Sequence, residues 1–298
     1  MKKTFTYKAF GLIIDSEFEI PELAVHEGLS DIDIILGKTP KQLNKITRQG
    51  VKYQATKNEF LLEVDDIARY YIKEGNQVIV ELLKEATDKE VRLFLLGSAF
   101  GALFLQRGLL PIHGSTIKFG NSATIFTGLS GVGKSSIAAY YLQLGYKILA
   151  DDISVVNEKF EVFPGLPNLK IWNDVLEKLK INKEPLTEIR PNIKKFHLPF
   201  STNYFNKPIS LKNIVVINIK NSSGFEIEEL TGIKKFNTIK NNTYRYQFIK
   251  GLEKQQNHFQ LLNKLLPQIK VYKVARPQSP LALSEFGNFI LSNINLDV

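Results

Sequence analysis

Gly128-Leu129-Ser130-Gly131-Val132-Gly133-Lys134-Ser135 fits the pattern G-x-x-x-x-G-K-[ST], the Walker A pattern of a phosphate-binding loop (P-loop). The apolar run Ala123–Thr127 before it predicts a buried strand, and Ser136–Leu144 after it predicts a helix closed by Gly145. A strand, a glycine-rich loop and a helix in this order are the context that the motif requires. The stretch therefore predicts an α/β domain built around a phosphate site, with a turn that binds no ligand as the alternative.

The residue types in the loop suit a nucleoside triphosphate. Glycines let backbone N–H groups approach phosphates closely, and a helix N-terminus adds positive potential. Lys134 is expected to reach the β- and γ-phosphates, and the Ser135 hydroxyl to hold Mg²⁺. The predicted ligands are ATP and Mg²⁺, and the predicted nucleotide-binding residues are Gly128, Leu129, Ser130, Gly131, Val132, Gly133, Lys134, Ser135 and Ser136.

Two adjacent carboxylates, Asp151 and Asp152, end the apolar strand Lys147–Ala150. This is the next strand after the loop's helix, so a right-handed crossover places it in the same sheet, with its carboxyl end beside the loop. One carboxylate there is suited to hold Mg²⁺, and the other to accept the proton of a hydroxyl that receives phosphate. The alternative is that one aspartate caps a turn and the other faces solvent.

Further candidates lie on both sides of this core motif. A hairpin around residues 118–121 would bring His113 to the far end of the site, although a lone histidine is more often structural. Trp172, the only tryptophan, is expected in core packing or an interface rather than in base stacking. Arginine and lysine neutralise a phosphoryl group well, and the downstream candidates, whose orientation the sequence leaves open, are Lys170, Arg190, Lys194, Lys195, Arg245 and Arg276.

Composition limits the class of protein. The chain has 298 residues, no cysteine and a net charge of +9, from 39 Lys and Arg against 30 Asp and Glu. Its lysines are scattered rather than clustered with aromatic residues, so we expect no nucleic-acid binding. The longest apolar stretch, residues 93–105, is interrupted and too short to span a membrane. We expect a cytoplasmic protein without a membrane partner, and the sequence leaves open whether it is a monomer or a homo-oligomer.

The chain divides into a β-rich N-terminal domain, residues 1–87, and a P-loop domain, residues 88–298. Thr87 and Glu90 resemble a capping box, which predicts a helix from Asp88 that ends at Gly108. The proline-containing segment 165–208 is expected to be irregular and to help recognise a substrate. The strands predicted in the first domain are 5–14, 32–36, 52–55, 60–64, 69–72 and 77–81, with a turn at 74–76.

The order of these motifs resembles the catalytic domain of HPr kinase/phosphorylase, a bacterial serine kinase with a phosphate loop. The resemblance is carried by His113-Gly114, the loop and Leu149-Ala150-Asp151-Asp152, and more weakly by Pro167–Trp172, Ala9–Leu12 and Ile20–Leu23. It implies an α/β, HPr-kinase-like catalytic domain with a smaller β-rich N-terminal domain. Some HPr-kinase-related proteins phosphorylate a lasso-peptide precursor on serine, which implies a peptide acceptor of that kind.

The resemblance also implies a role for each residue. Asp151 would be the catalytic base, Asp152 would support the metal together with Ser135, and His113 would contact the phosphoryl group. Lys134 would keep its place on the phosphates. Ser136 stands where the bifunctional enzymes carry glutamate, and the glycine-rich stretch of phosphorolysis is not found. A kinase without the reverse activity is therefore implied.

The leading hypothesis is an enzyme, an ATP-dependent kinase that phosphorylates a hydroxyl, serine by preference, on a peptide or protein. A kinase for a small molecule is the alternative among enzymes, because a phosphate site says nothing about acceptor size. A regulator that binds ATP without chemistry is the alternative from another class. The pair of aspartates favours an enzyme, since a sensor needs a metal carboxylate but no base.

Overall fold

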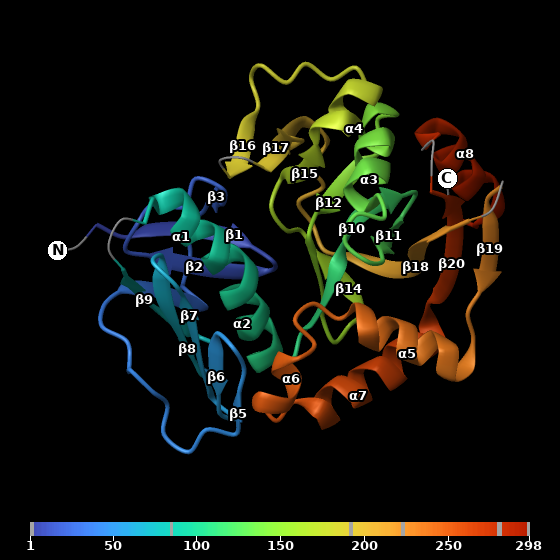
Figure 1. Cartoon of the computed structure of the whole chain (residues 1–298). Coiled ribbons are helices and arrows are strands. Elements are labelled where there is room, and N and C mark those ends of the chain that lie inside the picture. Colours follow the sequence, from blue (N-terminus) through green and yellow to red (C-terminus); the bar gives the residue numbers. More distant parts are fainter. Residues whose placement is uncertain (1–2, 84–85, 191–192, 222–223, 279–281, 297–298) are drawn as a thin grey trace. The chain divides into compact units, whose positions relative to one another are not determined.

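The structure, a computed structural model, describes residues 3–83, 86–190, 193–221, 224–278 and 282–296 (Figure 1). It is a mixed α/β protein with several sheets and divides into two compact units. The first unit is Met1–Pro111 with Thr243–Leu261, and the second is Ile112–Asn242 with Leu262–Val298. These units are compact parts of one structure and do not test the domain boundary expected after residue 87, which stays a prediction. Within the described ranges, no helix has the length and apolar character needed to cross a membrane.

In the first unit, nine of the described strands form one sheet in the order β3-β1-β2-β4-β9-β8-β7-β6-β5. The strands expected at 32–36, 60–64, 69–72 and 77–81 are present, as are the helix at Asp88 and its capping box. The elements are β1 (Phe5–Ala9), β2 (Leu12–Ser16), β3 (Ala24–Val25), β4 (Ile32–Leu36), β5 (Arg48–Gln49), β6 (Tyr53–Ala55), β7 (Glu59–Val64), β8 (Ala68–Lys73), β9 (Gln77–Leu82), α1 (Asp88–Phe94), the π-helical turn η1 (Leu95–Ala99), α2 (Phe100–Gln106) and α6 (Phe248–Gly251).

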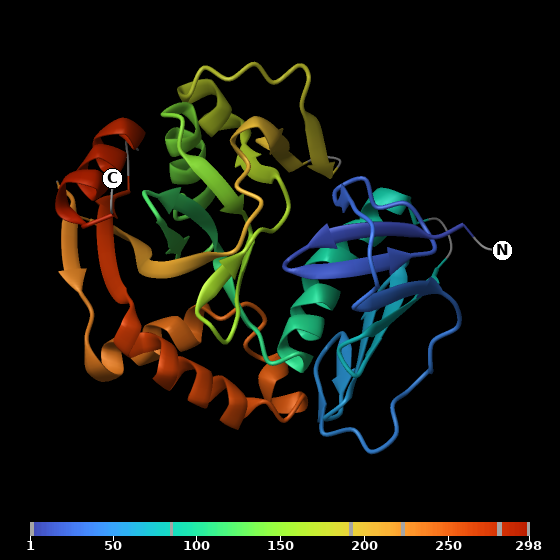
Figure 2. The ribbon, with the colours of Figure 1, turned by 180° about the vertical axis from the view of Figure 1, so that it is seen from behind.

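The single strand expected over residues 5–14 is wrong, because two strands occupy this stretch. β1 and β2 lie side by side as an antiparallel hairpin (Figure 2), with Tyr7 opposite Ile14. The turn between them is Phe10-Gly11, and both residues have positive φ, 54° and 74°. Two central residues with positive φ are typical of the type I′ turn that suits a two-residue hairpin. A phenylalanine in the first of these positions conceals the turn from sequence patterns.

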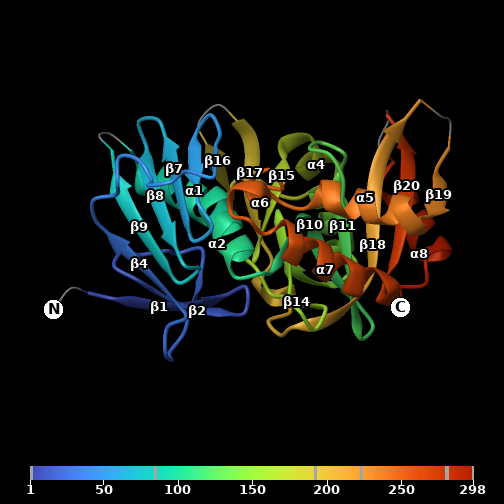
Figure 3. The same ribbon diagram turned by 90° about the horizontal axis from the view of Figure 1, so that it is seen from below.

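Helices α1 and α2, joined by η1, run along the sheet of the first unit (Figure 3). The Phe10 ring packs against Phe104 with centroids 4.9 Å apart, and the buried Tyr70 hydroxyl donates to the Val91 carbonyl at 2.8 Å. Burial of such large apolar side chains is the main stabilising term in a packed layer of this kind.

The second unit carries the glycine-rich loop and the predicted polar residues around it. Its elements are β10 (Leu110–Phe119), which begins in the first unit, β11 (Ser122–Thr127), α3 (Lys134–Gln143), β12 (Lys147–Ala150), β13 (Ile153–Val156), β14 (Glu161–Phe163), β15 (Asn168–Trp172), α4 (Asn173–Lys178), β16 (Thr187–Arg190), β17 (Ile193–Pro199), the 3₁₀ turn η2 (Ser201–Asn203), β18 (Ile209–Lys220), β19 (Glu226–Glu229), α5 (Gly232–Asn242), α7 (Gln255–Leu265), which begins in the first unit, the 3₁₀ turn η3 (Leu266–Gln268), β20 (Lys270–Pro277) and α8 (Leu283–Asn293).

The central sheet of this unit brings the loop and the aspartates to the same end of the sheet. β10 pairs antiparallel with β11 on one side and with β12 on the other, so β11 and β12 run in the same direction. Their carboxyl ends, followed by Gly128 and Asp151, therefore lie at the same end of the sheet, as the crossover argument predicted. β11 also pairs in parallel with β18, and β18 with β20. Helix α3 packs beside α8, where the Tyr141 hydroxyl donates to the Gly287 carbonyl.

The segment 165–208 is more ordered than expected. Helix α4 lies where a short helical piece, residues 174–179, was expected, but the segment also contains a sheet in the order β15-β17-β16, so its interpretation as irregular is wrong for the described residues. On this sheet, Leu169 faces Leu198 and Ile171 faces Phe196 on the side that packs into the core. The described prolines of the segment lie at strand ends and connections, where proline is tolerated. Their number made a small sheet resemble a loop in composition.

Candidate functional site

The loop between β11 and α3 has a backbone that only glycine adopts easily. Gly128, Gly131 and Gly133 have φ values of 137°, 84° and 104°. A Cβ on Gly128 would lie 2.4 Å from the Ile217 carbonyl oxygen, so β18 also excludes a side chain there. Gly133 is the N-cap of α3 and supplies no side-chain cap. The first amides of the helix are thus left for a ligand, as in anion sites at helix N-termini.

Lys134 folds back over the loop that precedes it. Its Nζ donates to the carbonyls of Gly128 at 3.0 Å and Leu129 at 2.9 Å, and the residue is only 8% exposed. Burial lowers its pKa, and the charges of Asp151 and Asp152 oppose that shift. Neutral carbonyls alone are modest partners for a buried ammonium group, which interacts more strongly with a phosphate oxygen. The lysine is therefore positioned toward the place expected for an anion.

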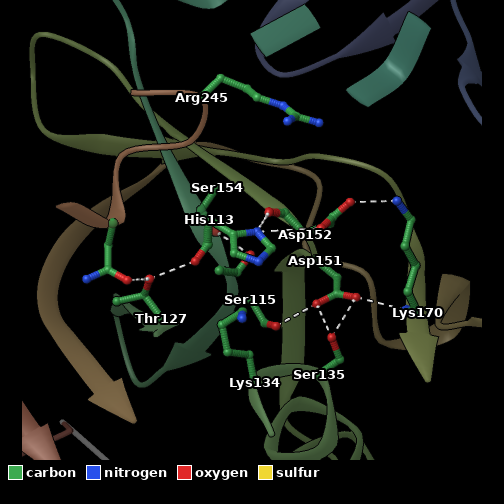
Figure 4. A network of polar contacts seen from close by, with 12 residues as sticks. His113, Ser115, Thr127, Lys134, Ser135, Asp151, Asp152, Ser154, Lys170 and Arg245 are labelled. Carbon is green, nitrogen blue, oxygen red and sulfur yellow. Dashed lines mark hydrogen bonds and ion pairs between the residues drawn. The ribbon is translucent and has the colours of Figure 1, made fainter. Parts of the chain in front are cut away.

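Asp151 is the centre of a hydrogen-bond cluster (Figure 4). Its Oδ1 accepts from Ser115 Oγ at 2.5 Å and from Ser135 Oγ at 2.9 Å, and Oδ2 accepts from the Lys170 backbone N–H at 2.8 Å. The residue is 6% exposed. These bonds join β10, α3 and β15 to the end of β12, so the carboxylate is held rigidly beside the loop.

Asp152 forms a second set of contacts with different partners. Its Oδ2 accepts from Lys170 Nζ at 2.6 Å, and its Oδ1 lies 3.5 Å from His113 Nδ1. The Asp152 backbone has φ 71°, an uncommon conformation for a non-glycine residue. This turn aims the Asp152 carbonyl back at β10, where it lies 2.9 Å from His113 Nδ1 and accepts weakly from the Gly114 N–H at 3.3 Å. Such strained residues cluster at functional sites.

The protonation states follow from this geometry. Desolvation raises the pKa of Asp152, but the charge of Lys170 and, at the acid pH where His113 is protonated, the charge of His113 outweigh it and hold the pKa well below its usual range. Burial and the charge of Lys134 lower the pKa of His113, against the pull of the two aspartates. A carbonyl only accepts hydrogen bonds, so Nδ1 of a neutral His113 carries the hydrogen and Nε2 is an acceptor. The site at neutral pH holds an ionised Asp152 beside a neutral imidazole.

These residues line a cavity of about 300 Å³, at the lower end of the range for small-molecule sites. Besides the loop and the aspartates it is bordered by His113, Lys170, Trp172, Lys195 and Arg276. Arg276, at the end of β20, donates from Nε to the Val132 carbonyl at 3.0 Å and so supports the loop.

Three cations at this cavity lack a carboxylate partner. In the part of the chain that the structure describes, neither Lys134, Lys195 nor Arg276 forms an ion pair with Asp or Glu. Lys170, by contrast, is paired with Asp152. Excess positive charge in a concave site favours a polyanionic ligand such as a triphosphate.

The basic residues proposed from sequence thus separate into groups. Lys170, Lys195 and Arg276 line the cavity, whereas Lys194 is exposed and is not among its lining residues. The Arg190 side chain is outside the described residues, and Arg245 belongs to the first unit, where its Nη2 donates to Ser98. Trp172 is 47% exposed at the cavity, so its expected place in the core is wrong.

Sequence reasoning gave no role to Ser115, which donates the shortest bond to Asp151. The alternation of a strand contained the signal. His113 and Ser115 are two residues apart on β10, so both point to the same face, and a site at one of them implied the other. Thr127, at the end of β11, also escaped notice; its hydroxyl donates to the His113 carbonyl at 2.7 Å and fixes that part of the strand.

The donor set fits a magnesium nucleotide. The described residues contain no group of three or more His, Cys, Asp or Glu side chains that would form a metal cage. Ser135 and Asp151 instead supply hard oxygen atoms next to the loop. Mg²⁺ bound with nucleotides takes only one or two protein ligands and completes its shell with phosphates and water. Ser135 with a neighbouring aspartate is therefore sufficient.

Comparison with known proteins adds little to this geometry. No family model matches the sequence, and no curated protein matches it. Among solved structures, the chain is similar to the Hpr(Ser) kinase/phosphatase from Coxiella burnetii, at 10% sequence identity and a TM-score of 0.32, over 61% of this chain and 88% of that chain. A likeness of this size assigns neither a family nor an activity, so the proposals below rest on the site itself.

Proposed function

We propose that this protein is an ATP-dependent P-loop kinase that transfers the γ-phosphoryl group to a hydroxyl, serine by preference, of a peptide or protein such as a ribosomal-peptide precursor. The observation that carries the proposal is the cluster of Lys134, Ser135 and Asp151 at a glycine loop, in a cavity where Lys134 and Arg276 form no ion pair with a carboxylate of the described residues. The order of motifs that resembles HPr kinase in the sequence agrees with it.

Nucleotide binding follows from the loop. The free amides at the start of α3 and the Lys134 ammonium group face the place of the β- and γ-phosphates. Arg276 adds positive charge on the other side of the loop. Mg²⁺, when bound by Ser135 and an aspartate, neutralises phosphate charge and orients the γ-phosphoryl group.

The division of labour between the two aspartates is the step on which sequence and geometry differ. The sequence left the two roles open, and the resemblance to HPr kinase implied Asp151 as the base and Asp152 as the metal support. We propose the reverse, because Ser135 contacts Asp151 and because three donors already occupy the Asp151 oxygens. Among the described residues, Asp152 Oδ1 has only the longer 3.5 Å contact with His113, and the Asp152 side chain is 30% exposed. This oxygen is thus more accessible than those of Asp151 to the proton of an acceptor hydroxyl.

His113 has a supporting part in this proposal. Its neutral ring, with hydrogen on Nδ1, offers Nε2 as an acceptor toward the acceptor hydroxyl or an ordered water. It also lies against Asp152, whose orientation it helps to fix. We therefore class His113 as a positioning residue, whereas the resemblance implied a contact with the phosphoryl group.

The test is phosphoryl transfer from γ-labelled ATP by the full chain to pools of serine-containing peptides. Wild type should label peptide, Lys134→Ala should not bind Mg·ATP, and Asp152→Asn should bind Mg·ATP but lose transfer by about 10²–10⁴-fold. Binding without transfer to any peptide, sugar, amino acid or nucleoside would favour the regulator, and label only on a small molecule would favour the other kinase class. Normal turnover by Lys134→Ala would exclude the loop from the mechanism.

A further inference from the structure

One face of the sheet β15-β17-β16 is polar and borders the cavity. Strand alternation places Lys170 and Trp172 on the same face of β15, opposite the core side that carries Leu169 and Ile171. In the register with β17, Lys195 is the direct partner of Trp172. Both side chains line the cavity, next to the aspartates.

Trp172 and Lys195 form a pair that the proposed chemistry leaves unused. The Lys195 ammonium lies 5.5 Å from the centroid of the indole ring, within the range of a cation–π contact. That contact holds the lysine in place but leaves its charge without a carboxylate partner among the described residues. Half of the indole surface is exposed beside it. An exposed aromatic ring next to an uncompensated cation is typical of a recognition site.

We propose that Trp172 and Lys195 form the acceptor subsite of the kinase and select a peptide with an acidic side chain next to the phosphorylated hydroxyl. The proposal rests on the proposed function for the meaning of "acceptor". The peptide backbone would lie against the indole, and its carboxylate would pair with the Lys195 ammonium group.

Charge complementarity is what favours this occupant. The Lys195 ammonium group has no carboxylate partner among the described residues, so an acidic residue of the acceptor is attracted to this subsite and a basic one is repelled. Lys195 also lines the same cavity as Asp152 and Lys134, so it lies near the groups at the catalytic end. A carboxylate bound to Lys195 would therefore hold the neighbouring hydroxyl close to Asp152.

Trp172 is the only tryptophan of the chain, so its fluorescence reports binding at the proposed subsite. We would titrate three pools of synthetic decapeptides with a central serine into the full chain in the presence of Mg·ADP. The flanking positions mix Gly and Ala with Asp and Glu in the acidic pool, with Lys and Arg in the basic pool, and with Asn and Gln in the neutral pool. Binding is followed by Trp172 fluorescence and by calorimetry. The acidic pool should bind more tightly than the neutral pool, and the basic pool most weakly.

Variants assign the effect to the subsite. Lys195→Ala should weaken binding of the acidic pool by about tenfold, the usual effect of losing one charge-assisted hydrogen bond, and Lys195→Glu should favour the basic pool. Lys194→Ala removes the same charge from the neighbouring exposed position and should change nothing. Trp172→Ala, followed by calorimetry, should weaken all pools without changing the affinity for Mg·ATP.

Other outcomes contradict the proposal. Equal affinity for the three pools, no binding of any pool, or an unchanged acidic preference in Lys195→Ala would overturn it. A loss of Mg·ATP affinity in Trp172→Ala would make the indole a base platform, and a lower kcat with unchanged peptide KM in Lys195→Ala would make the lysine a phosphoryl contact. Failure of the proposed kinase is distinct: the acidic pool would then bind at this subsite but receive no phosphate.

Discussion

Replacement of Asp151 separates its structural part from its chemical part, because asparagine and alanine treat its three donors differently. Two donors are hydroxyls, Ser115 and Ser135, and the third is the backbone N–H of Lys170. In Asp151→Asn, the amide oxygen is able to take the Oδ2 place and accept from Lys170. The amide NH₂ then takes the Oδ1 place and donates to the hydroxyls, which also accept hydrogen bonds. Asparagine thus leaves each of the three groups with a hydrogen-bond partner, although the two hydroxyls then accept instead of donating.

Alanine removes the acceptor from all three. The Ser135 hydroxyl is partly exposed and is able to turn to water, but Ser115 is fully buried and the Lys170 N–H cannot turn. Each buried donor that loses its acceptor costs about 1–3 kcal/mol, so Asp151→Ala should lower the free energy of unfolding by about 2 kcal/mol or more. Asp151→Asn loses only the charge on its hydrogen bonds and should cost about 1 kcal/mol.

Trp172 gives a direct assay, since the single tryptophan lies in the second unit and reports the unfolding of that unit. Urea unfolding followed by its fluorescence should rank the free energies as wild type, then Asp151→Asn, then Asp151→Ala. In the same samples, Asp151→Asn should bind Mg·ATP more weakly than wild type, because an NH₂ group faces Ser135 at the place of the metal. Asp152→Asn should keep that affinity and lose transfer.

Two results would refute this reasoning. If Asp151→Ala is as stable as Asp151→Asn, the three donors do not depend on the carboxylate and the cluster is not as described. If Asp151→Asn binds Mg·ATP normally but transfers no phosphate, and Asp152→Asn loses metal affinity, the original assignment from sequence is right and the reversed one is wrong.

Three further predictions concern the loop and His113. Lys134→Ala should abolish Mg·ATP binding in calorimetry but leave the urea midpoint unchanged, because the hydrogen bonds of Lys134 Nζ to the described residues go to two loop carbonyls. Gly128→Ala should lose about 1–3 kcal/mol more stability than Gly131→Ala, since both have positive φ but only the first places a Cβ against a backbone oxygen. Burial and the Lys134 charge lower the pKa of His113 below its ordinary 6.5, so the unfolded chain takes up a proton more readily. Its contribution to stability is full above pH 6.5 and is lost as the pH falls toward the folded pKa; His113→Gln should flatten the stability profile there.

The sequence contained enough to place the loop, because its three glycines and its lysine have few other uses at that spacing. It also placed the aspartates, since the crossover rule fixes which end of β12 lies beside the loop. The sequence did not contain the direction of each aspartate side chain. Asp151 and Asp152 are chemically identical neighbours, and the left-handed backbone at Asp152 sends one toward Ser135 and the other toward Lys170.

The two wrong predictions of secondary structure have a common cause. A turn at Phe10-Gly11 and a small sheet within 165–208 both depend on long-range packing that overrides local preference. Phe10 accepts a positive φ because its ring is buried against Phe104. The strands of the small sheet form because Leu169 and Ile171 reach the core cluster of the second unit. Neither partner is near in sequence, so composition alone suggested a continuous strand in one case and a loop in the other.

The sheet β15-β17-β16 explains why no sequence motif indicated the proposed acceptor subsite. A phosphate is recognised by backbone amides and one lysine at fixed spacing, so its site leaves a pattern in the chain. In the acceptor subsite that we propose, the recognising side chains meet across strands, Trp172 on β15 and Lys195 on β17, and their pairing is set by register rather than by spacing. If the loop keeps its nucleotide-binding residues while the neighbouring sheet changes its acceptor-binding residues, one phosphate site is able to serve different peptides. Substitution of Trp172 or Lys195 should therefore alter the acceptor preference that we propose without loss of Mg·ATP binding.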